Sequence, residues 1–285
     1  MAKISISEFT DPVCPWAWSA EPHRLKLEWT YGDSLSWETR MVGLSEDPAE
    51  SAKRFTPEEM GKIFAMMSAR FGMPIYEGGP ERMYASFPAC CAVVATRLND
   101  PLRAKPLLRE LRRRCFYGQL IDEGEVIESA AETVGIEPAD LKIWLSDDAT
   151  ESAFREDMEA ARDPSPAALA MKRKLAESDG GWRYTCPSYV FTLGAYSLTA
   201  PGFQPYETYE TALANLDPSL EQSAPASSVA TALEWAEAQG EGALATVEVA
   251  ALRGIEPEQA RDELIEAGAE ETPIGTGSFW SLLNR

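Results

Sequence analysis

A single thiol stands at the position where the sequence offers its clearest chemistry. In DPVCPWAW, Cys14 is followed by Pro15 and Trp16, and Ala17 stands where a second cysteine would complete a Cys-x-x-Cys pair. The alternating segment KISISEF before it predicts a strand, and Pro15 suits the first turn of a helix. Cys14 would then lie at the positive end of a helix dipole beside free backbone N–H groups, which stabilise a thiolate. We therefore predict that Cys14 is a nucleophile.

The other cysteines and the one histidine are weaker candidates for a chemical role. Cys90, Cys91 and Cys115 lie on helical patterns, where free cysteine is usually buried in the core. The one histidine, His23, lies on the same predicted helix as Cys14, too far along it to act as a base for the thiol, so we expect a structural or surface role. With so few ligands and no Cys-x-x-Cys pair, we predict that the protein binds no metal.

The elements around Cys14 predict a mixed α/β fold. In chain order we expect a strand over 3–9, a helix over about 15–31, a strand over 34–44, helices over about 56–178, strands over 186–193 and 196–200, and a helix over about 204–216. The first three form a β-α-β unit with parallel strands. We therefore expect one α/β domain over residues 1–217, with a helical insertion over about 56–178.

The C-terminal segment has a pattern of its own. Residues 217–228 are polar and contain proline, which predicts a linker. Beyond it, the region 229–285 predicts a helix, two short helices around Gly254 and a small hairpin, the order of a winged-helix module. Its three arginines and eleven acidic residues give it a net charge of -8. Because a DNA-binding module needs a basic face, we expect this one to contact protein.

Composition narrows the possible environments and partners. No apolar run approaches the length of a membrane span, and the opening residues alternate like a strand, so we expect a cytoplasmic protein that binds no membrane. The net charge of -20 repels nucleic acid. Within this acidic chain the basic run RAKPLLRELRRR, residues 103–114, predicts a solvated helix face that pairs with neighbouring acids, with an anionic partner as the alternative.

The motif and the order of elements together resemble a known family. The segments FTDPVCPWAWSAEP and TCPSYVF resemble the DsbA-like thioredoxin-fold proteins, most closely the cytoplasmic FrnE-like branch, over about residues 3–217. The resemblance implies that Pro187 forms a cis peptide bond facing the active-site cysteine, and that Cys186 lies beside Cys14. It also implies substrate contacts from Pro15, Trp16, Ala17, Pro187 and Ser188.

This resemblance implies a thiol-disulfide oxidoreductase or isomerase, but Ala17 removes the usual resolving cysteine. In a monothiol route Cys14 attacks a disulfide or an electrophile, and glutathione or another low-molecular-weight thiol completes the cycle. In a two-cysteine route Cys14 and Cys186 form a disulfide, which requires their Cα atoms to lie within about 7 Å. Either route implies no tightly bound cofactor, and a protein disulfide, a small thiol or an electrophile as the substrate.

Two other functions stay open. The kappa glutathione transferases and the hydroxychromene-carboxylate isomerases share this architecture and use a single Ser or Cys near this position, so a glutathione-dependent transferase or isomerase is one alternative. Some relatives of the branch present a transcription factor to a Clp-type protease. The incomplete motif and the acidic C-terminal module fit such a non-catalytic adaptor, with the module as a candidate protein-binding part.

Overall fold

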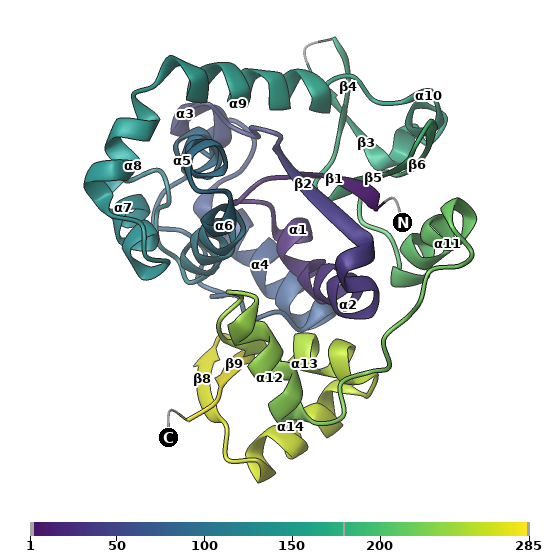
Figure 1. Ribbon diagram of the computed structural model, residues 1–285. Coiled ribbons are helices and arrows are strands. Elements are labelled where there is room, and N and C mark those ends of the chain that lie inside the picture. Colours follow the sequence, from purple (N-terminus) through teal and green to yellow (C-terminus); the bar gives the residue numbers. More distant parts are fainter. Residues whose placement is uncertain (1–2, 179, 284–285) are drawn as a thin grey trace.

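The protein is built around a four-stranded mixed sheet (Figure 1). The computed structural model describes residues 3–178 and 180–283. The sheet has the order β2-β1-β5-β6, in which β1 and β2 are parallel and the other neighbours are antiparallel. The strands are β1 (Ile4–Thr10), β2 (Leu35–Met41), β5 (Ser188–Leu193) and β6 (Tyr196–Ala200). This confirms the predicted α/β class, a thioredoxin-type sheet with helical additions.

The crossover from β1 to β2 is helical but broken. It comprises α1 (Pro15–Ser19), α2 (Glu21–Tyr31) and the short 3-10 helix η1 (Gly32–Ser34). The prediction of one helix over about 15–31 was therefore wrong at Ala20. Pro22 has no backbone N–H to donate to the carbonyl of Trp18, so the helical hydrogen-bond series is interrupted there. The short α1 carries Cys14 at its start and directs Trp18 into the core.

One face of the sheet is covered by α2 and α11 (Tyr206–Leu216). Because side chains alternate along a strand, Ile4 and Ile6 of β1 point to the same face. They pack with Leu27 and Tyr31 of α2, and with Leu35, Tyr189, Phe191, Tyr209 and Leu213. This buried layer holds the first half of β1, and the turn to Cys14 begins at the other end of the strand.

The helical insertion follows β2. Its helices are α3 (Pro48–Ala52), α4 (Pro57–Phe71), α5 (Phe87–Asn99), α6 (Pro101–Phe116), α7 (Gly124–Thr133), α8 (Pro138–Leu145), α9 (Asp148–Ala161) and α10 (Pro166–Leu169). Helix α4 begins with a capping box in which Thr56 and Glu59 satisfy each other's backbone N–H groups. Helix α9 packs beside β2, and α4 packs beside α1. The insertion thus packs against both the helical crossover and the second strand of the β-α-β unit.

A hairpin at the end of the insertion departs from the sequence prediction. Helices were expected to about residue 178, but the 3-10 helix η2 (Lys172–Lys174) leads into β3 (Leu175–Ser178), which pairs with β4 (Gly181–Tyr184). Gly180 has a positive φ of 79°, which favours a tight reversal of the chain. Tyr184 stacks on Phe9 of β1, with ring centroids 4.5 Å apart. Contact with the distant β1 therefore outweighs the local helical pattern.

The C-terminal segment forms a second small sheet with its own helices. Its elements are α12 (Val229–Ala238), β7 (Leu244–Ala245), α13 (Thr246–Arg253), α14 (Pro257–Glu266), β8 (Glu270–Ile274) and β9 (Gly277–Ser281). The strand order is β7-β9-β8. Leu25 of α2 joins the core of this segment, and α13 lies against α2. The segment therefore packs directly on the helix that follows the Cys14 turn, while the predicted domain boundaries at 217 and 229 stay predictions.

A buried ionic cluster joins the C-terminal segment to α2 and α6. It consists of Glu21, Arg24, Arg109, Arg112, Glu241 and Glu248. Arg24 pairs with Glu241 at 2.9 Å, and Arg109 with Glu248 at 2.8 Å. Arg109 and Arg112 belong to the basic run over 103–114, which was expected to be solvated. That expectation was wrong for these two residues, because acids from α2 and the C-terminal segment cover them.

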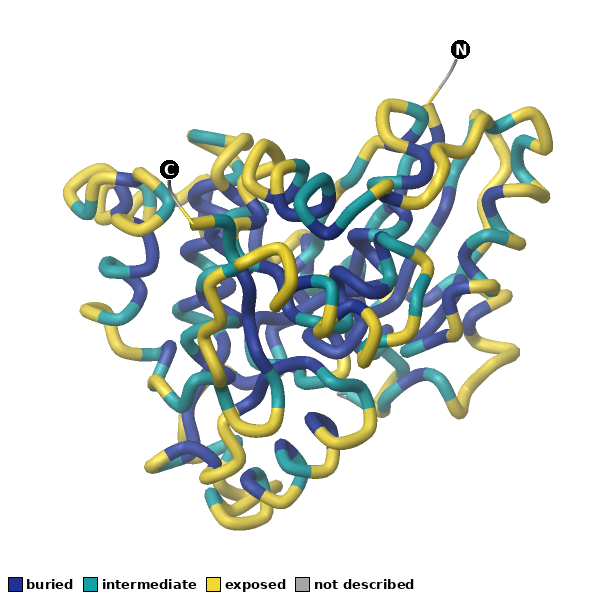
Figure 2. The backbone as a smooth tube through the Cα atoms, turned by 90° about the horizontal axis from the view of Figure 1, so that it is seen from below, coloured by how far each residue is buried: buried dark blue, intermediate teal, exposed yellow. Residues whose placement is uncertain are grey.

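Burial is continuous through the middle of the molecule. Figure 2 shows buried segments running through the centre and exposed ones along the periphery. Among residues 3–178 and 180–283, no helix is both long enough and apolar enough to cross a membrane.

Candidate active site

Cys14 occupies the N-cap of α1, directly after the turn that follows β1. Its backbone is extended, and Pro15 takes the first helical position. The N–H groups at a helix start have no acceptor within the helix, so those of Trp16 and Ala17 are available to the sulfur. The Cys14 side chain is almost buried. The local structure is thus the strand-turn-helix that the sequence predicted.

A second thiol meets Cys14 from the start of β5. Cys186 precedes β5, and its peptide bond to Pro187 is cis. The thiol of Cys14 donates a hydrogen bond to the backbone carbonyl of Cys186, with the sulfur 3.4 Å from the oxygen. Both cysteines are buried and neither forms a disulfide. The fold therefore brings together two thiols that are 172 residues apart in the chain.

The pKa values of the two thiols are shifted in opposite directions. A hydrogen bond from the Cys186 side chain is the main effect that lowers the pKa of Cys14, and the N–H groups of Ala17 and Trp16 add to it, against the opposing effect of burial. Burial raises the pKa of Cys186 well above its ordinary value, and the neighbouring Cys14 raises it further. When Cys14 loses its proton, its hydrogen bond to the Cys186 carbonyl is lost and the Cys186 S–H is the donor to the thiolate. Of the two thiols, Cys14 is therefore the one that ionises more readily.

A buried carboxyl group lies close to both thiols. Asp11 is completely buried, and burial is the main reason that its pKa is raised. It accepts hydrogen bonds from the backbone N–H groups of Val13 and Leu44, the hydroxyl of Ser86 and the thiol of Cys90. Its charge raises the pKa of both Cys14 and Cys186. No sequence pattern marked Asp11 as more than a turn residue, although it stands within the Cys14 motif.

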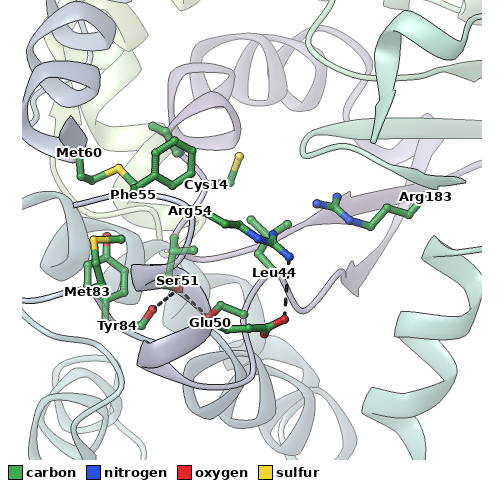
Figure 3. A pocket seen from close by; sticks show the side chains of 13 residues that line it. Cys14, Leu44, Glu50, Ser51, Arg54, Phe55, Met60, Met83, Tyr84 and Arg183 are labelled. Atoms are coloured by element: carbon green, nitrogen blue, oxygen red, sulfur yellow. Dashed lines mark hydrogen bonds and ion pairs between the residues drawn. The ribbon is translucent and has the colours of Figure 1, made fainter. Parts of the chain in front are cut away.

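An apolar cavity of about 220 Å³ opens beside Cys14 (Figure 3). Its apolar wall includes Val13, Leu44, Phe55, Met60 and Met83. The guanidinium groups of Arg54 and Arg183 point toward one another beside Cys14. Arg54 lies 3.9 Å from a carboxylate oxygen of Glu50, and Arg183 donates to the backbone carbonyl of Tyr184. A group that reaches the thiol here meets apolar side chains and two cations.

A second cavity, of about 390 Å³, borders Cys186. The rings of Trp16, Phe71 and Phe203 line it and contact one another, with centroids between 4.9 and 5.7 Å apart. Its basic lining residues are Arg70, Arg173 and Lys174. The two cavities therefore approach the thiol pair from the Cys14 side and from the Cys186 side, and each carries positive charge.

Comparison with known families decides where the chain belongs. Residues 8–165 match the model of a family described as thioredoxin. This is more than half of the 285 residues. The chain belongs to the thioredoxin family. Its helical insertion gives it the DsbA-like form of that fold.

Individual relatives of this thioredoxin-family chain are distant. The ClpXP adapter protein SpxH of Halalkalibacterium halodurans is 23% identical over 295 residues, which cover 98% of this chain and 89% of that protein. A candidate protein disulfide isomerase from Nitrosomonas europaea has a similar structure, with a TM-score of 0.59, 18% identity, and coverage of 75% of this chain and 97% of that one. The cytosolic disulfide reductase DsbM from Pseudomonas aeruginosa, in its structure with GSH, has a TM-score of 0.51, 17% identity, and coverage of 73% and 98%. At these identities the structural matches establish the fold.

The other residues predicted to contact substrate differ in whether they line a cavity beside the two cysteines. Pro15 lines the cavity beside Cys14, and Trp16 lines the one beside Cys186. Ala17, Pro187 and Ser188 are buried and line neither of these two cavities. The Ser188 hydroxyl instead donates to the carbonyl of Thr185 and accepts from the N–H of Gly202, which holds the loop that carries Cys186.

The weaker candidates lie in the core or against aromatic rings. Cys90 and Cys115 are buried, and burial raises the pKa of Cys115 to about 12. His23 packs against the rings of Phe203, Tyr206 and Tyr209, and burial lowers its pKa to about 4. Within the described part of the chain, no group of three or more His, Cys, Asp or Glu side chains is placed to hold a metal ion.

Proposed function

We propose that this protein is a thiol-disulfide oxidoreductase in which Cys14 is the attacking thiol. The observation that carries the proposal is the pairing of Cys14 with Cys186 at a helix N-terminus, where one thiol has a lowered pKa and the other a raised one. A thiolate is the form of cysteine that attacks disulfides. The proposal rests on this geometry together with membership of the thioredoxin family.

The reaction proceeds by two exchanges. The Cys14 thiolate attacks one sulfur of a substrate disulfide, the substrate S–S bond breaks, and the released thiolate takes a proton from solvent. A second, external thiolate then attacks the substrate sulfur of the mixed disulfide and regenerates the Cys14 thiolate. The substrate sulfurs have then exchanged one partner, and Cys14 is unchanged. A low-molecular-weight thiol such as glutathione fits the second step, and we propose a reducing, cytoplasmic compartment as the place where it is supplied.

The raised pKa of Cys186 favours this monothiol route over an internal disulfide. Burial is the main cause of that shift, ahead of the effect of Cys14 itself. Cys186 is therefore a poor source of thiolate, and its S–H serves instead as the hydrogen-bond donor that stabilises the Cys14 thiolate. Attack by Cys186 on the mixed disulfide is the second route, and it ends in a Cys14–Cys186 disulfide that two external thiols must reduce.

A thiol map by mass spectrometry tests the proposal. Wild type, Cys14→Ser and Cys186→Ser are oxidised mildly with diamide in the presence and absence of glutathione, with Cys115→Ser as a buried-thiol control. In the samples that contain glutathione, we expect a mixed disulfide between Cys14 and glutathione in every variant except Cys14→Ser. A Cys14–Cys186 crosslink in the wild type would assign the two-cysteine route. An unmodified Cys14 in all samples would overturn the proposal.

A second function, that of a protein adaptor, is favoured by one specific observation. The similarity to the ClpXP adapter protein SpxH spans 98% of this chain, and so includes the C-terminal segment. An adaptor holds its client through surface contacts and needs no thiol chemistry. Capture of a client protein to the same extent by wild type and Cys14→Ser would favour this function, and capture that depends on Cys14 would favour the oxidoreductase.

A further inference from the structure

The basic side chains without an acidic partner gather at the thiol site. The chain has 26 Lys and Arg residues against 46 Asp and Glu residues, and most of its cations form ion pairs. In the part of the chain that the structure describes, those with no carboxylate at ion-pair distance are Lys26, Lys53, Arg70, Lys172, Arg173, Lys174 and Arg183. Four of them, Arg70, Arg173, Lys174 and Arg183, line the two cavities beside Cys14 and Cys186. We call these four residues the basic rim.

The basic rim is assembled from separate elements. Arg70 comes from the last turn of α4, Arg173 and Lys174 from η2, and Arg183 from β4. Lys174 gives one hydrogen bond to the backbone carbonyl of Phe203, which leaves further N–H donors on its ammonium group. Arg70 lies over the ring of Phe71, 5.1 Å from its centroid. Arg70, Lys174 and Arg183 are therefore held by contacts with neutral groups.

An acidic chain that leaves these cations unpaired creates a local attraction for anions. The net charge of -20 repels an anionic ligand from most of the surface, so the basic rim is the part of the thiol site that such a ligand can approach. Guanidinium and ammonium groups form short, charge-assisted hydrogen bonds with carboxylates. Because both cavities carry cations, a complementary ligand has carboxylates on both sides of the reacting sulfur.

We propose that the basic rim binds an acidic peptide segment that carries the substrate cysteine. One acidic side chain would meet Arg183 beside Cys14, and another would meet Arg70, Arg173 and Lys174 beside Cys186. The rings of Trp16, Phe71 and Phe203, which line the cavity beside Cys186, provide an apolar surface for other side chains of the peptide. This inference rests on Cys14 being the attacking thiol, and it adds the chemical class of the protein substrate.

Peptides of matched sequence test the charge preference. Each of three peptides carries one cysteine, activated as a mixed disulfide with 2-thiopyridine. The residues on both sides of this cysteine are Glu in the first peptide, Gln in the second and Lys in the third. The Cys14 thiolate attacks the peptide sulfur, the bond to the pyridyl sulfur breaks, and pyridine-2-thione leaves with the electron pair and a proton. Its absorbance gives the rate. We expect the Glu peptide to react about tenfold faster than the Gln peptide at low salt, and the Lys peptide to react more slowly than both.

Charge-matched variants locate the preference. Arg70→Gln with Arg173→Gln removes two exposed cations of the basic rim, while Lys142→Gln with Arg155→Gln removes two exposed cations that line neither cavity. We expect the first pair to lose most of the preference for the Glu peptide and the second pair to keep it. The preference should also shrink as salt is added, because exposed charges are screened.

The outcomes separate this inference from the proposed function. Equal rates for the three peptides, with Cys14-dependent release of pyridine-2-thione, would overturn the acidic-peptide inference and leave the oxidoreductase intact. A preference for oxidised glutathione over glutathione diethyl ester disulfide, with no preference among the peptides, would assign the basic rim to a small carboxylate thiol and likewise overturn the inference. No Cys14-dependent release from any disulfide would overturn the proposed function itself.

Discussion

Two regions of this protein hold arginines in contrasting surroundings. In the buried ionic cluster, Arg109 is enclosed and paired with Glu248 and Glu21. In the basic rim, Arg70 and Arg173 are exposed and have no acidic partner among the described residues. A buried charge must be paired within the fold, because water cannot reach it. The same residue type therefore stabilises the docking of the C-terminal segment in one region and is available to a ligand in the other.

The largest difference between the two regions is expected in stability. Arg109→Ala leaves Glu248 buried without its ionic partner and removes one of the three arginines that pair with Glu21. This should lower the free energy of unfolding by about 3–5 kcal/mol. Arg173→Ala, at an exposed site, should change it by less than about 0.5 kcal/mol. Urea denaturation of both variants measures this contrast. Equal, small changes would show that the buried cluster contributes no more to stability than the exposed rim.

The buried His23, which packs against Phe203, predicts a loss of stability as the pH falls. Burial lowers the pKa of His23 from 6.5 to about 4 in the folded protein. As the pH falls below 6.5, this residue takes up a proton in the unfolded chain but not in the folded one. The folded state therefore loses stability until the pH reaches the folded pKa. Between about pH 6.5 and 5 this amounts to about 1–2 kcal/mol. Denaturation of wild type and His23→Gln over this range tests it, and parallel curves for the two proteins would contradict it.

Within the thiol site, the donor rather than the cations is expected to control acidity. Cys186→Ala removes the S–H that stabilises the Cys14 thiolate, so the pKa of Cys14 should rise and its alkylation near neutral pH should slow several-fold. Cys186→Ser keeps a donor and should stay closer to wild type. The rate of iodoacetamide alkylation as a function of pH reports the pKa directly. If Ser and Ala at this position slow the reaction equally, the hydrogen bond is not what stabilises the thiolate.

The smallest expected effect concerns Arg183. This residue lowers the pKa of Cys186, but it is not among the main groups that set the pKa of Cys14. Arg183→Gln should therefore leave the pH profile of Cys14 alkylation nearly unchanged while weakening the preference for the acidic peptide. A clear shift of the Cys14 profile would mean that the basic rim also activates the thiol.

Local patterns determined the backbone structure around Cys14. The alternation before Cys14 and the proline after it predicted a strand, a turn and a helix N-terminus, and the structure has them. These features depend on residues a few positions apart, where backbone propensity and capping decide the conformation. The family resemblance then indicated Cys186 as the neighbour, which no local pattern could do.

Only the tertiary structure decided what surrounds that thiol. The sequence shows RAKPLLRELRRR as basic but does not show that Arg109 is buried against Glu248, since that partner is contributed by the C-terminal segment. In the same way, Asp11 accepts hydrogen bonds from Leu44 and Ser86, which are distant in the sequence. The β3–β4 hairpin depends on the contact of Tyr184 with Phe9. Burial and charge pairing depend on which distant segments meet, because desolvation is set by everything that packs around a group. The sequence by itself therefore determined the strand, turn and helix start around Cys14, and the folded chain decided which charges are paired within it and which are not.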